Sequence, residues 1–550
     1  MMEHLDQKRK ITTIVAIMAV MLFAALNQTI VGSALPRIIA DLGGLQYFSW
    51  VFTIFMLTSS VTSVLVGKLS DIYGRKQFIL IGIAIFMVGS FLCGWAETII
   101  QLIVYRGIQG FGGGMVMSTS FAAVGDLFAP RERARWQGIM GGIFGLASVF
   151  GPTLGGYIVD HADWHWIFWV FLPFGLLAFA LIWRLFPAVE GKQREPVDYL
   201  GAVLLTLTIV PMLLAFSLGG NQYAWSSLEI IALLAATVAA LVLFIAAERR
   251  AANPIMPLSL FGDSVFTLSN LAALTMSAGM FGTIMYMPMF VQGVIGASAT
   301  ASGFVMMPMM LSMVAASALS GEFINKTGKY KRLALFGLLV MTAGMVSLTF
   351  MSTETTRLVA VINMIVVGVG LGIANPIFTL TVQNVVEHKL LGVATAASQL
   401  FRQIGGTVGV ALLGTVMGHR LNAEMMNRIA AAGISDQAGG DPAVAEQLAK
   451  LQDPQLLMDP ERLAQIQQSL PDSAQQLFTQ LVSMMREALN VSLSTVFLAG
   501  ALVVFSAFVL TLFLRELPLR TTNKRTAERE QTFAETAKAQ PNSRCRAKLI

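Results

Sequence analysis

Long apolar runs separated by short polar stretches fill most of the chain. A run of about 20 apolar residues can cross a ~30 Å hydrocarbon core as an α-helix. Fourteen such runs occur, which predicts an all-α polytopic membrane protein with 14 transmembrane helices. The predicted helices are centred near residues 23, 57, 87, 112, 147, 175, 208, 237, 277, 309, 341, 369, 402 and 504.

The apolar pattern is doubled within the chain. Segment 67–76 recurs 254 residues later at 321–330, with two glycines and a basic residue in register. Glycines of the fifth predicted helix recur in the thirteenth at the same offset, and those of the fourth recur in the twelfth at an offset of 258. Such repeats are typical of transporters with a substrate site between two halves. We therefore expect two six-helix bundles joined by an inserted helix pair.

The repeat and the polar segments divide the chain into six regions. In the long polar loop, apolar residues at helical spacing predict short amphipathic helices, and a plain spacer would fit the same composition. We expect the N-terminal six-helix bundle at 1–190, the inserted helix pair at 191–252, the first five helices of the C-terminal bundle at 253–417, a long extracytoplasmic loop at 418–490, the last helix of that bundle at 491–517 and a cytoplasmic disordered tail at 518–550.

Composition supports a membrane protein and excludes several other classes. Charged residues make up only 12% of the chain, against about 25% in soluble proteins. Lys and Arg gather in the short loops on the side of the N-terminus, which places both termini in the cytoplasm by the positive-inside rule. The net charge of +6 therefore reflects topology and not nucleic-acid binding. The sequence has no Walker loop, nucleophile elbow or metal-ligand cluster, so we expect no enzyme activity, cofactor or metal.

A few strongly polar residues lie inside the predicted helices. Asn27 and Gln28 lie deep in the first helix, and Arg106 lies in the fourth at nearly the same height. Arg402 lies near the midplane in the thirteenth helix. A charged side chain in hydrocarbon costs at least ~2.5 kcal/mol and by default marks a functional site. Bonds from the two arginines to backbone carbonyls or glutamines are the structural alternative.

Three motifs carry a resemblance to a known family. GKLSDIYGRK at 67–76 lies between the second and third helices, YRGIQGFGGG at 105–114 in the fourth, and ASVFGPTLGG at 147–156 in the fifth. With these motifs the chain resembles the major facilitator superfamily and, within it, the fourteen-helix drug:proton antiporters, from residue 11 to 515. The third resembles the antiporter motif, with Ala147 where glycine is usual. The resemblance implies the major facilitator fold and multidrug efflux across a bacterial-type inner membrane.

The resemblance also implies roles for single residues. At the cytoplasmic rim, Gly74 permits a tight turn, and Asp71 and Arg75 can form an ion pair. Asn325 and Asn384 occupy the matching acidic positions of the second half, which predicts a weaker latch there. As an alternative, the charges only enforce topology and cap helix ends. The implied conformational latch contains Gly67, Asp71, Gly74, Arg75 and Asp126, and the antiporter motif contains Gly151, Pro152, Gly155 and Gly156.

Position 27 departs from the family pattern. The stretch LNQTIVGSALP at 26–36 resembles a motif in which aspartate, a candidate proton carrier, stands where this chain has Asn27. An amide cannot titrate, and we find no other acid near the midplane of a predicted helix. Coupling could use a rim acid such as Asp126, the protein could be uncoupled, or Asn27 could be an engineered substitution that fixes a protonated-like state. The implied proton-coupling site contains Asn27, Arg106 and Gln109.

The ninth and tenth predicted helices are rich in methionine, with ten between Met276 and Met313. Flexible thioethers and aromatic rings suit a pocket for varied apolar ligands, and the rings could accept lipophilic cations. Methionine as ordinary apolar filler would give the same pattern. The predicted substrate-cavity residues are Gln28, Met276, Met280, Tyr286, Asn375 and Arg402.

These features predict a secondary active transporter that exports amphipathic and cationic drugs by proton antiport with alternating access. A lipid or lysolipid transporter of the same fold is the alternative, and a non-transporting receptor or scaffold would require the motifs to be vestigial. The expected partners are small amphipathic substrates, protons and the lipid bilayer. We expect the chain to act as a monomer.

Overall fold

The structure, a computed structural model, describes residues 6–42, 48–128, 130–187, 198–220, 223–251, 254–297, 299–387, 390–432, 467–468 and 472–519. These ranges are helical apart from turns and short connections, so the predicted all-α fold is confirmed. Twelve helices in these ranges are long and apolar enough to cross a membrane. Two further long helices, α4 (Ile99–Leu127) and α5 (Pro130–His161), are rich in glycine, and α4 carries Arg106 and Gln109.

The first half packs around one apolar core drawn from all of its helices. It contains α4, α5 and a last span that is broken between two helices. The other elements are α1 (Gln7–Leu42), α2 (Phe48–Tyr73), α3 (Arg75–Cys93), α6 (Trp166–Trp169) and α7 (Leu172–Leu185).

The second half has its own apolar core, built from helices of 18 to 42 residues. Its first long helix ends in a short π-helical turn. The elements are η2 (Leu258–Gly262), α10 (Ser264–Met289), η3 (Phe290–Val294), α11 (Ala299–Thr327), α12 (Lys331–Leu348), α13 (Arg357–Val385), α14 (Leu391–Ala432) and α18 (Asp472–Leu512).

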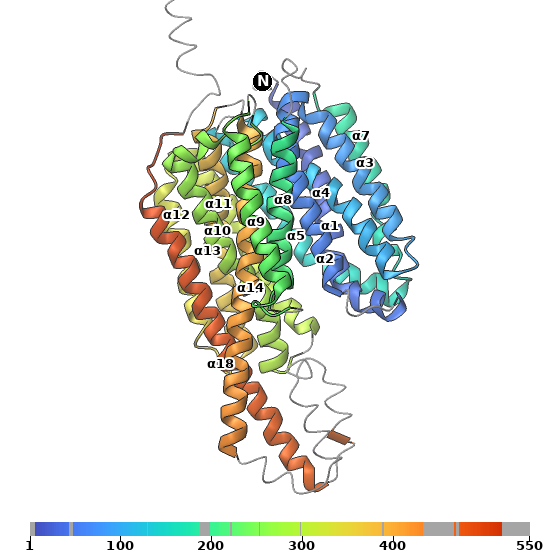
Figure 1. Cartoon of the computed structure of the whole chain (residues 1–550), viewed down its shortest axis with the longest axis vertical. Coiled ribbons are helices and arrows are strands. Elements are labelled where there is room, and N and C mark those ends of the chain that lie inside the picture. Colours follow the sequence, from blue (N-terminus) through green and yellow to red (C-terminus); the bar gives the residue numbers. More distant parts are fainter. Residues whose placement is uncertain are drawn as a thin grey trace, which may run out of the picture.

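The two halves stand side by side, and the chain begins and ends its helical part at the same end of the bundle (Figure 1). That end carries Arg75, Lys76, Arg133, Arg135 and Lys326, and we call it the basic end. At the opposite end α14 and α18 project beyond the other helices (Figure 1). The long loop predicted at 418–490 is shorter in the structure, because α14 continues to Ala432 and α18 begins at Asp472, so that stretch 472–489 is part of a long helix and not a separate amphipathic one. The amphipathic helices predicted between these two helices and the tail from 520 onward lie outside the described residues.

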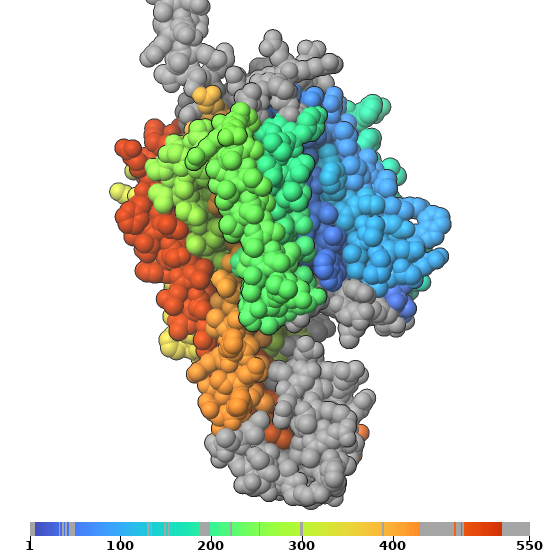
Figure 2. Space-filling model, in the orientation of Figure 1, coloured from blue at the N-terminus to red at the C-terminus, as the bar shows by residue number. Residues whose placement is uncertain are grey.

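The inserted pair, α8 (Tyr199–Leu218) and α9 (Leu228–Glu248), lies over the line between the halves. In Figure 2 its green surface covers that line on the face shown. Asp198 and Ser227 cap the two helices, because their side chains accept the N–H groups of Gly201 and Ile230. A separate apolar cluster joins this pair to α2 and α14, so it contacts both halves.

The sequence repeat is visible in the turns of the backbone. Gly74 ends α2 with φ 98°, and Gly328, 254 residues later, ends α11 with φ 70°. Glycine adopts this left-handed region without the steric cost that a Cβ would bring. The same two turns therefore separate the second and third helices of each half.

Candidate functional site

A chain of hydrogen bonds crosses the first half between α1, α3 and α4. Arg106 Nη1 donates to Oε1 of Gln109 at 2.5 Å, and Gln109 Nε2 donates to Oδ1 of Asn27 at 2.7 Å. Asn27 Nδ2 donates in turn to Oγ of Ser90 at 3.1 Å. All four side chains are buried. The structure thus joins Asn27 and Arg106, which the sequence placed at the same height, through Gln109.

Arg106 is fully buried, and its partners in the described part of the chain are neutral. Its Nε donates to the backbone oxygen of Val51 at 3.3 Å. Its guanidinium carbon lies 4.4 Å from the ring centroid of Phe55. The face of an aromatic ring attracts a cation through its quadrupole. Two residues of α2 therefore help to hold this charge without a carboxylate.

The second buried arginine lies near the middle of the other half. Arg402 Nη1 donates to Oγ1 of Thr379 at 2.8 Å and to Oδ1 of Asn375 at 3.3 Å. Both acceptors belong to α13, and Arg402 belongs to α14. The predicted cavity residues Asn375 and Arg402 are thus brought together, although 27 residues separate them.

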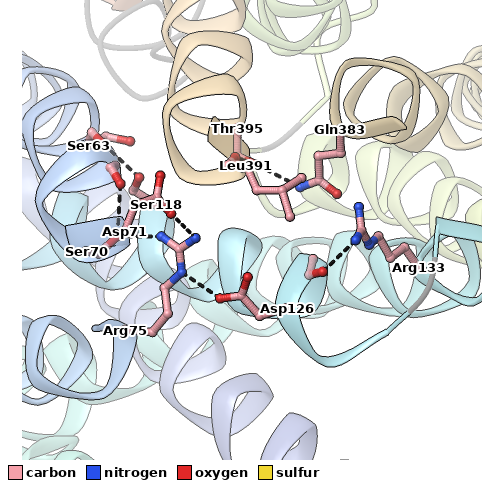
Figure 3. A network of polar contacts seen from close by, with 12 residues as sticks. Ser63, Ser70, Asp71, Arg75, Ser118, Asp126, Arg133, Gln383, Leu391 and Thr395 are labelled. Atoms are coloured by element: carbon pink, nitrogen blue, oxygen red, sulfur yellow. Dashed lines mark hydrogen bonds and ion pairs between the residues drawn. The ribbon is translucent and has the colours of Figure 1, made fainter. Parts of the chain in front are cut away.

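At the basic end, Arg75 joins two carboxylates of the first half (Figure 3). Its Nη2 pairs with Oδ1 of Asp71, and its Nε pairs with Oδ2 of Asp126 at 2.9 Å. Its Nη1 donates to Oγ of Ser70 at 2.6 Å. Arg75 is only 5% exposed, so the charges are held in a largely dry environment. This rim cluster of Ser70, Asp71, Arg75 and Asp126 connects α2, α3 and α4.

The rim cluster lies against the start of α14 in the second half. A Cβ added at Gly392 would lie 2.5 Å from Oδ2 of Asp71 and 2.7 Å from Nη1 of Arg75. The partial positive charge of a helix N-terminus favours a nearby carboxylate. A Cβ added at Gly67 would lie 2.6 Å from Cβ of Ala396. Two glycines therefore bring α2 and α14 into close backbone contact.

A second contact joins the halves through α5 and α11. A Cβ added at Gly138 would lie 2.5 Å from the backbone oxygen of Ser317. Near the basic end, Gln137 Nε2 donates to Oε1 of Gln383 on α13 at 2.8 Å. The repeat relates α2 to α11 and α5 to α14. The helix pairs α2–α14 and α5–α11 are therefore equivalent contacts in the doubled fold.

Comparison with known proteins matches this architecture. A family model described as Major Facilitator Superfamily matches residues 17–410. The chain is 39% identical over 540 residues to the Multidrug transporter protein MdtP of Bacillus subtilis (strain 168), with 97% of each chain covered. The chain belongs to the Major Facilitator Superfamily. The family recognised from the motifs is thus confirmed, and the family is one of transporters.

Two further matches extend the likeness over most of the chain. Multidrug resistance protein 3 of Bacillus subtilis (strain 168) is 33% identical over 505 residues, covering 92% of this chain and 95% of its own. The solved structure of the superfamily's proton:xylose symporter XylE, bound to 6-bromo-6-deoxy-D-glucose, gives a TM-score of 0.58 at 13% identity. That match covers 96% of this chain and 100% of XylE. At this identity it shows the shared superfamily fold alone.

The predicted antiporter motif lies in the C-terminal half of α5, away from Gln137 and Gly138. A Cβ added at Gly151 would lie 2.0 Å from Oγ1 of Thr29 on α1. Thr29 Oγ1 also donates to the backbone oxygen of Ala147 at 2.9 Å. Gly151 therefore packs α5 closely on α1, within the first half. Gly155 is buried, and Pro152 and Gly156 lie in the same helix.

The other predicted cavity residues do not form one group: three lie in α10 of the second half, and one lies in α1 of the first half. Met276 is fully buried in the core of the second half, and Met280 packs against that core. Tyr286 donates through its hydroxyl to the backbone oxygen of Val410 at 3.1 Å. Gln28 contacts the sulfur of Met56 at 3.6 Å. Their role in substrate binding stays a prediction.

The second half has no equally buried counterpart of Arg75 at the repeat position. Lys329 occupies that position and is exposed, and Asn325 and Asn384 replace the two aspartates. The neighbouring Tyr330 is fully buried, and burial raises the pKa of its phenol. The weaker latch predicted for this half stays a prediction.

Three buried residues of the site were not predicted from the sequence. These are Ser90, Gln137 and Arg133. Arg133 donates to the backbone oxygens of Phe128 and Gly125 at 2.8 and 2.6 Å, and Figure 3 shows it pointing toward Gln383. In the sequence it stands between two other arginines, 131 and 135, and such a group of basic residues indicates a cytoplasmic loop. Hydropathy alone gives no sign that the side chain of Arg133 is buried.

Proposed function

We propose that this chain is a secondary exporter of amphipathic drugs that works by alternating access in exchange for protons. Its family consists of transporters, and two relatives that align over most of their length are a multidrug transporter and a multidrug resistance protein. The proposal places the basic end in the cytoplasm of a bacterial-type inner membrane. In this proposal the exporter is a monomer.

The observation that carries the proposal is the contact between the halves toward the basic end. Small residues and hydrogen-bonding side chains form it, as at Gly67 with Ala396 and at Gln137 with Gln383. Such a contact can separate without breaking the apolar core of either half. With the basic end in the cytoplasm, this arrangement corresponds to a carrier closed to the inside.

The proton-coupling position of the proposal is residue 27. Asn27 donates to Ser90 and accepts from Gln109, and a protonated carboxyl group could make the same two bonds. Asn27 therefore imitates the protonated form of an aspartate, and proton exchange at this position itself requires an aspartate there. An aspartate at this position would release its proton when the surroundings change.

The test compares residue 27 as Asn and as Asp in the purified protein. Substrate is added to the protein in weakly buffered detergent solution, and proton release is measured with a pH-sensitive dye. Release from the Asn27→Asp variant alone supports coupling at this position. Equal release from both proteins would assign coupling to another acid, such as Asp126, and no release from either would contradict proton antiport.

Export itself is measured in liposomes with a panel of drugs, dyes and lysolipids. Concentrative transport of a drug or dye against its gradient supports the proposal. Movement of lysolipids alone would instead favour the lipid-transporter alternative. Absence of exchange for every compound would favour a non-transporting role.

A further inference from the structure

Arg402 places a positive charge deep inside the second half. Its helix, α14, begins at the basic end with Leu391. At ~1.5 Å per residue, Arg402 lies ~16 Å from that end, near the middle of a membrane. Its hydrogen-bond acceptors, Asn375 and Thr379, are neutral. The charge therefore has no carboxylate partner in the described part of the chain.

Part of the Arg402 guanidinium remains available. Only Nη1 has a partner among the described residues, which leaves the N–H groups on Nε and Nη2 free. Arg402 also keeps some exposed surface, whereas Arg106 is 0% exposed and closed in by its neighbours. Of the two interior arginines, Arg402 is therefore the less enclosed one.

Two glutamines of α14 near Arg402, one about a turn before it and one directly after it, add unused polar atoms. Gln399 is 8% exposed, and its Nε2 is buried without a partner in the structure. Oε1 of Gln403 is likewise buried without a partner. A buried amide with an unmet hydrogen bond costs free energy unless a ligand or water completes the bond. The free N–H groups of Arg402 and Gln399 form a set of donors that suits an acceptor-rich group.

The charge inside the bundle is positive. Arg106 and Arg402 lie within the spans, whereas the described aspartates and glutamates lie toward helix ends or on the projecting parts of α14 and α18. Two interior cations without an interior carboxylate repel a lipophilic cation and attract an anion. Guanidinium forms two parallel hydrogen bonds with a carboxylate, sulfonate or phosphate.

We propose that Arg402, with Asn375, Thr379 and Gln399, forms a binding subsite for the anionic group of an amphipathic substrate. The inference rests on the proposed export function and specifies its substrate class. The exported compounds are then amphipathic acids, in place of the cationic drugs that the methionine and aromatic content suggested.

The test uses fluorescein and rhodamine 123, which share a xanthene ring system but are anionic and cationic at neutral pH. Binding to the purified full chain is measured by fluorescence polarisation. We expect tighter binding of fluorescein, at least tenfold weaker binding of it by Arg402→Gln, and a smaller loss by Arg402→Lys. Arg420→Gln is the matched control, because Arg420 lies on the same helix but pairs with Glu424 at 2.9 Å.

The outcomes separate the subsite from the export proposal. Tighter binding of rhodamine 123 by the unmodified chain, or no fluorescein binding at millimolar concentration, would overturn the subsite. Equal weakening of both dyes by Arg402→Gln would also overturn it, because that pattern indicates a structural role. Arg402-dependent fluorescein binding without export in liposomes would retain the subsite and reject export. Dye export together with a fluorescein affinity that does not depend on Arg402 would retain export and reject the subsite.

Discussion

Asn27 is held by groups that specify an amide or a neutral acid. The hydroxyl of Ser90 donates to the backbone oxygen of Phe168 at 2.9 Å, so it offers only lone pairs to residue 27. Asn27 Nδ2 donates its hydrogen to this hydroxyl oxygen at 3.1 Å. An ionised aspartate would place an acceptor against an acceptor, whereas a protonated one would donate as Asn27 does. In this conformation the site therefore favours the neutral form of a carboxyl group.

Replacing Gln109 with Leu should destabilise the protein. The change leaves Nη1 of Arg106 and Oδ1 of Asn27 buried without partners, which costs about 2 kcal/mol or more. Thermal unfolding in detergent should show a lower melting temperature. Gln77→Leu is the control, because Gln77 is exposed on α3. Equal melting of the two variants would contradict the importance of the hydrogen-bond chain.

At the scale of helices, local spacing predicted some contacts and missed others. The motif at 67–76 predicted the ion pair of Asp71 and Arg75 and the tight turn at Gly74, and the structure has both. The bond between Gln137 and Gln383 joins residues 246 apart. Such contacts depend on how two complete halves pack, and no local pattern encodes that distance. The helices and the repeat could therefore be predicted, but the polar pairs between halves could not.

Replacing Arg75 with Gln should weaken both the fold and the contact with α14. Two largely buried carboxylates, Asp71 and Asp126, would lose their ion-pair partner at a cost of about 3 kcal/mol. We expect a lower melting temperature and reduced export. Lys76→Gln is the control, since Lys76, within the ranges that the structure describes, donates only to an exposed backbone oxygen, that of Trp183. Unchanged melting of Arg75→Gln would show that the cluster contributes no stability.

Replacing Gly67 with Leu should push α2 away from α14. Even a Cβ there would lie 2.9 Å from the backbone oxygen of Gly392, which cannot move aside as a side chain can. We expect the basic end to open, so that a cysteine placed at Gln137 reacts faster with a water-soluble thiol reagent. Gly303→Leu is the control, because a Cβ there has nothing within 4 Å. Slower or unchanged labelling would contradict a close contact between α2 and α14.

For the whole molecule, the inserted pair connects the two halves. Ser217 at the end of α8 shares a hydrogen bond of 3.0 Å with Thr53 of α2. Trp225, in the turn before α9, donates to Oγ1 of Thr415 on α14 at 2.8 Å. These bonds lie toward the end opposite the rim cluster. The pair therefore bridges the contact between α2 and α14. When the halves rock, either the pair moves with one half or one of these two bonds breaks.

Alternating access predicts that a covalent link between the halves stops transport. A Cβ added at Gly142 on α5 would lie 3.7 Å from Cβ of Val314 on α11, within the roughly 3.5–4.5 Å range of disulfides. In a chain whose two native cysteines are replaced by serine, oxidised Gly142→Cys/Val314→Cys should lose export and regain it on reduction. Liposomes loaded with an exported dye report both states.

The matched link lies within one half. A Cβ added at Gly282 on α10 would lie 3.9 Å from Cβ of Leu413 on α14, so Gly282→Cys/Leu413→Cys can form an equivalent disulfide. Because both helices move with the second half, this link should leave export unchanged. Persistent export with a complete α5–α11 disulfide would mean that the halves need not separate along that pair. Loss of export from both oxidised variants would point instead to motion inside the second half.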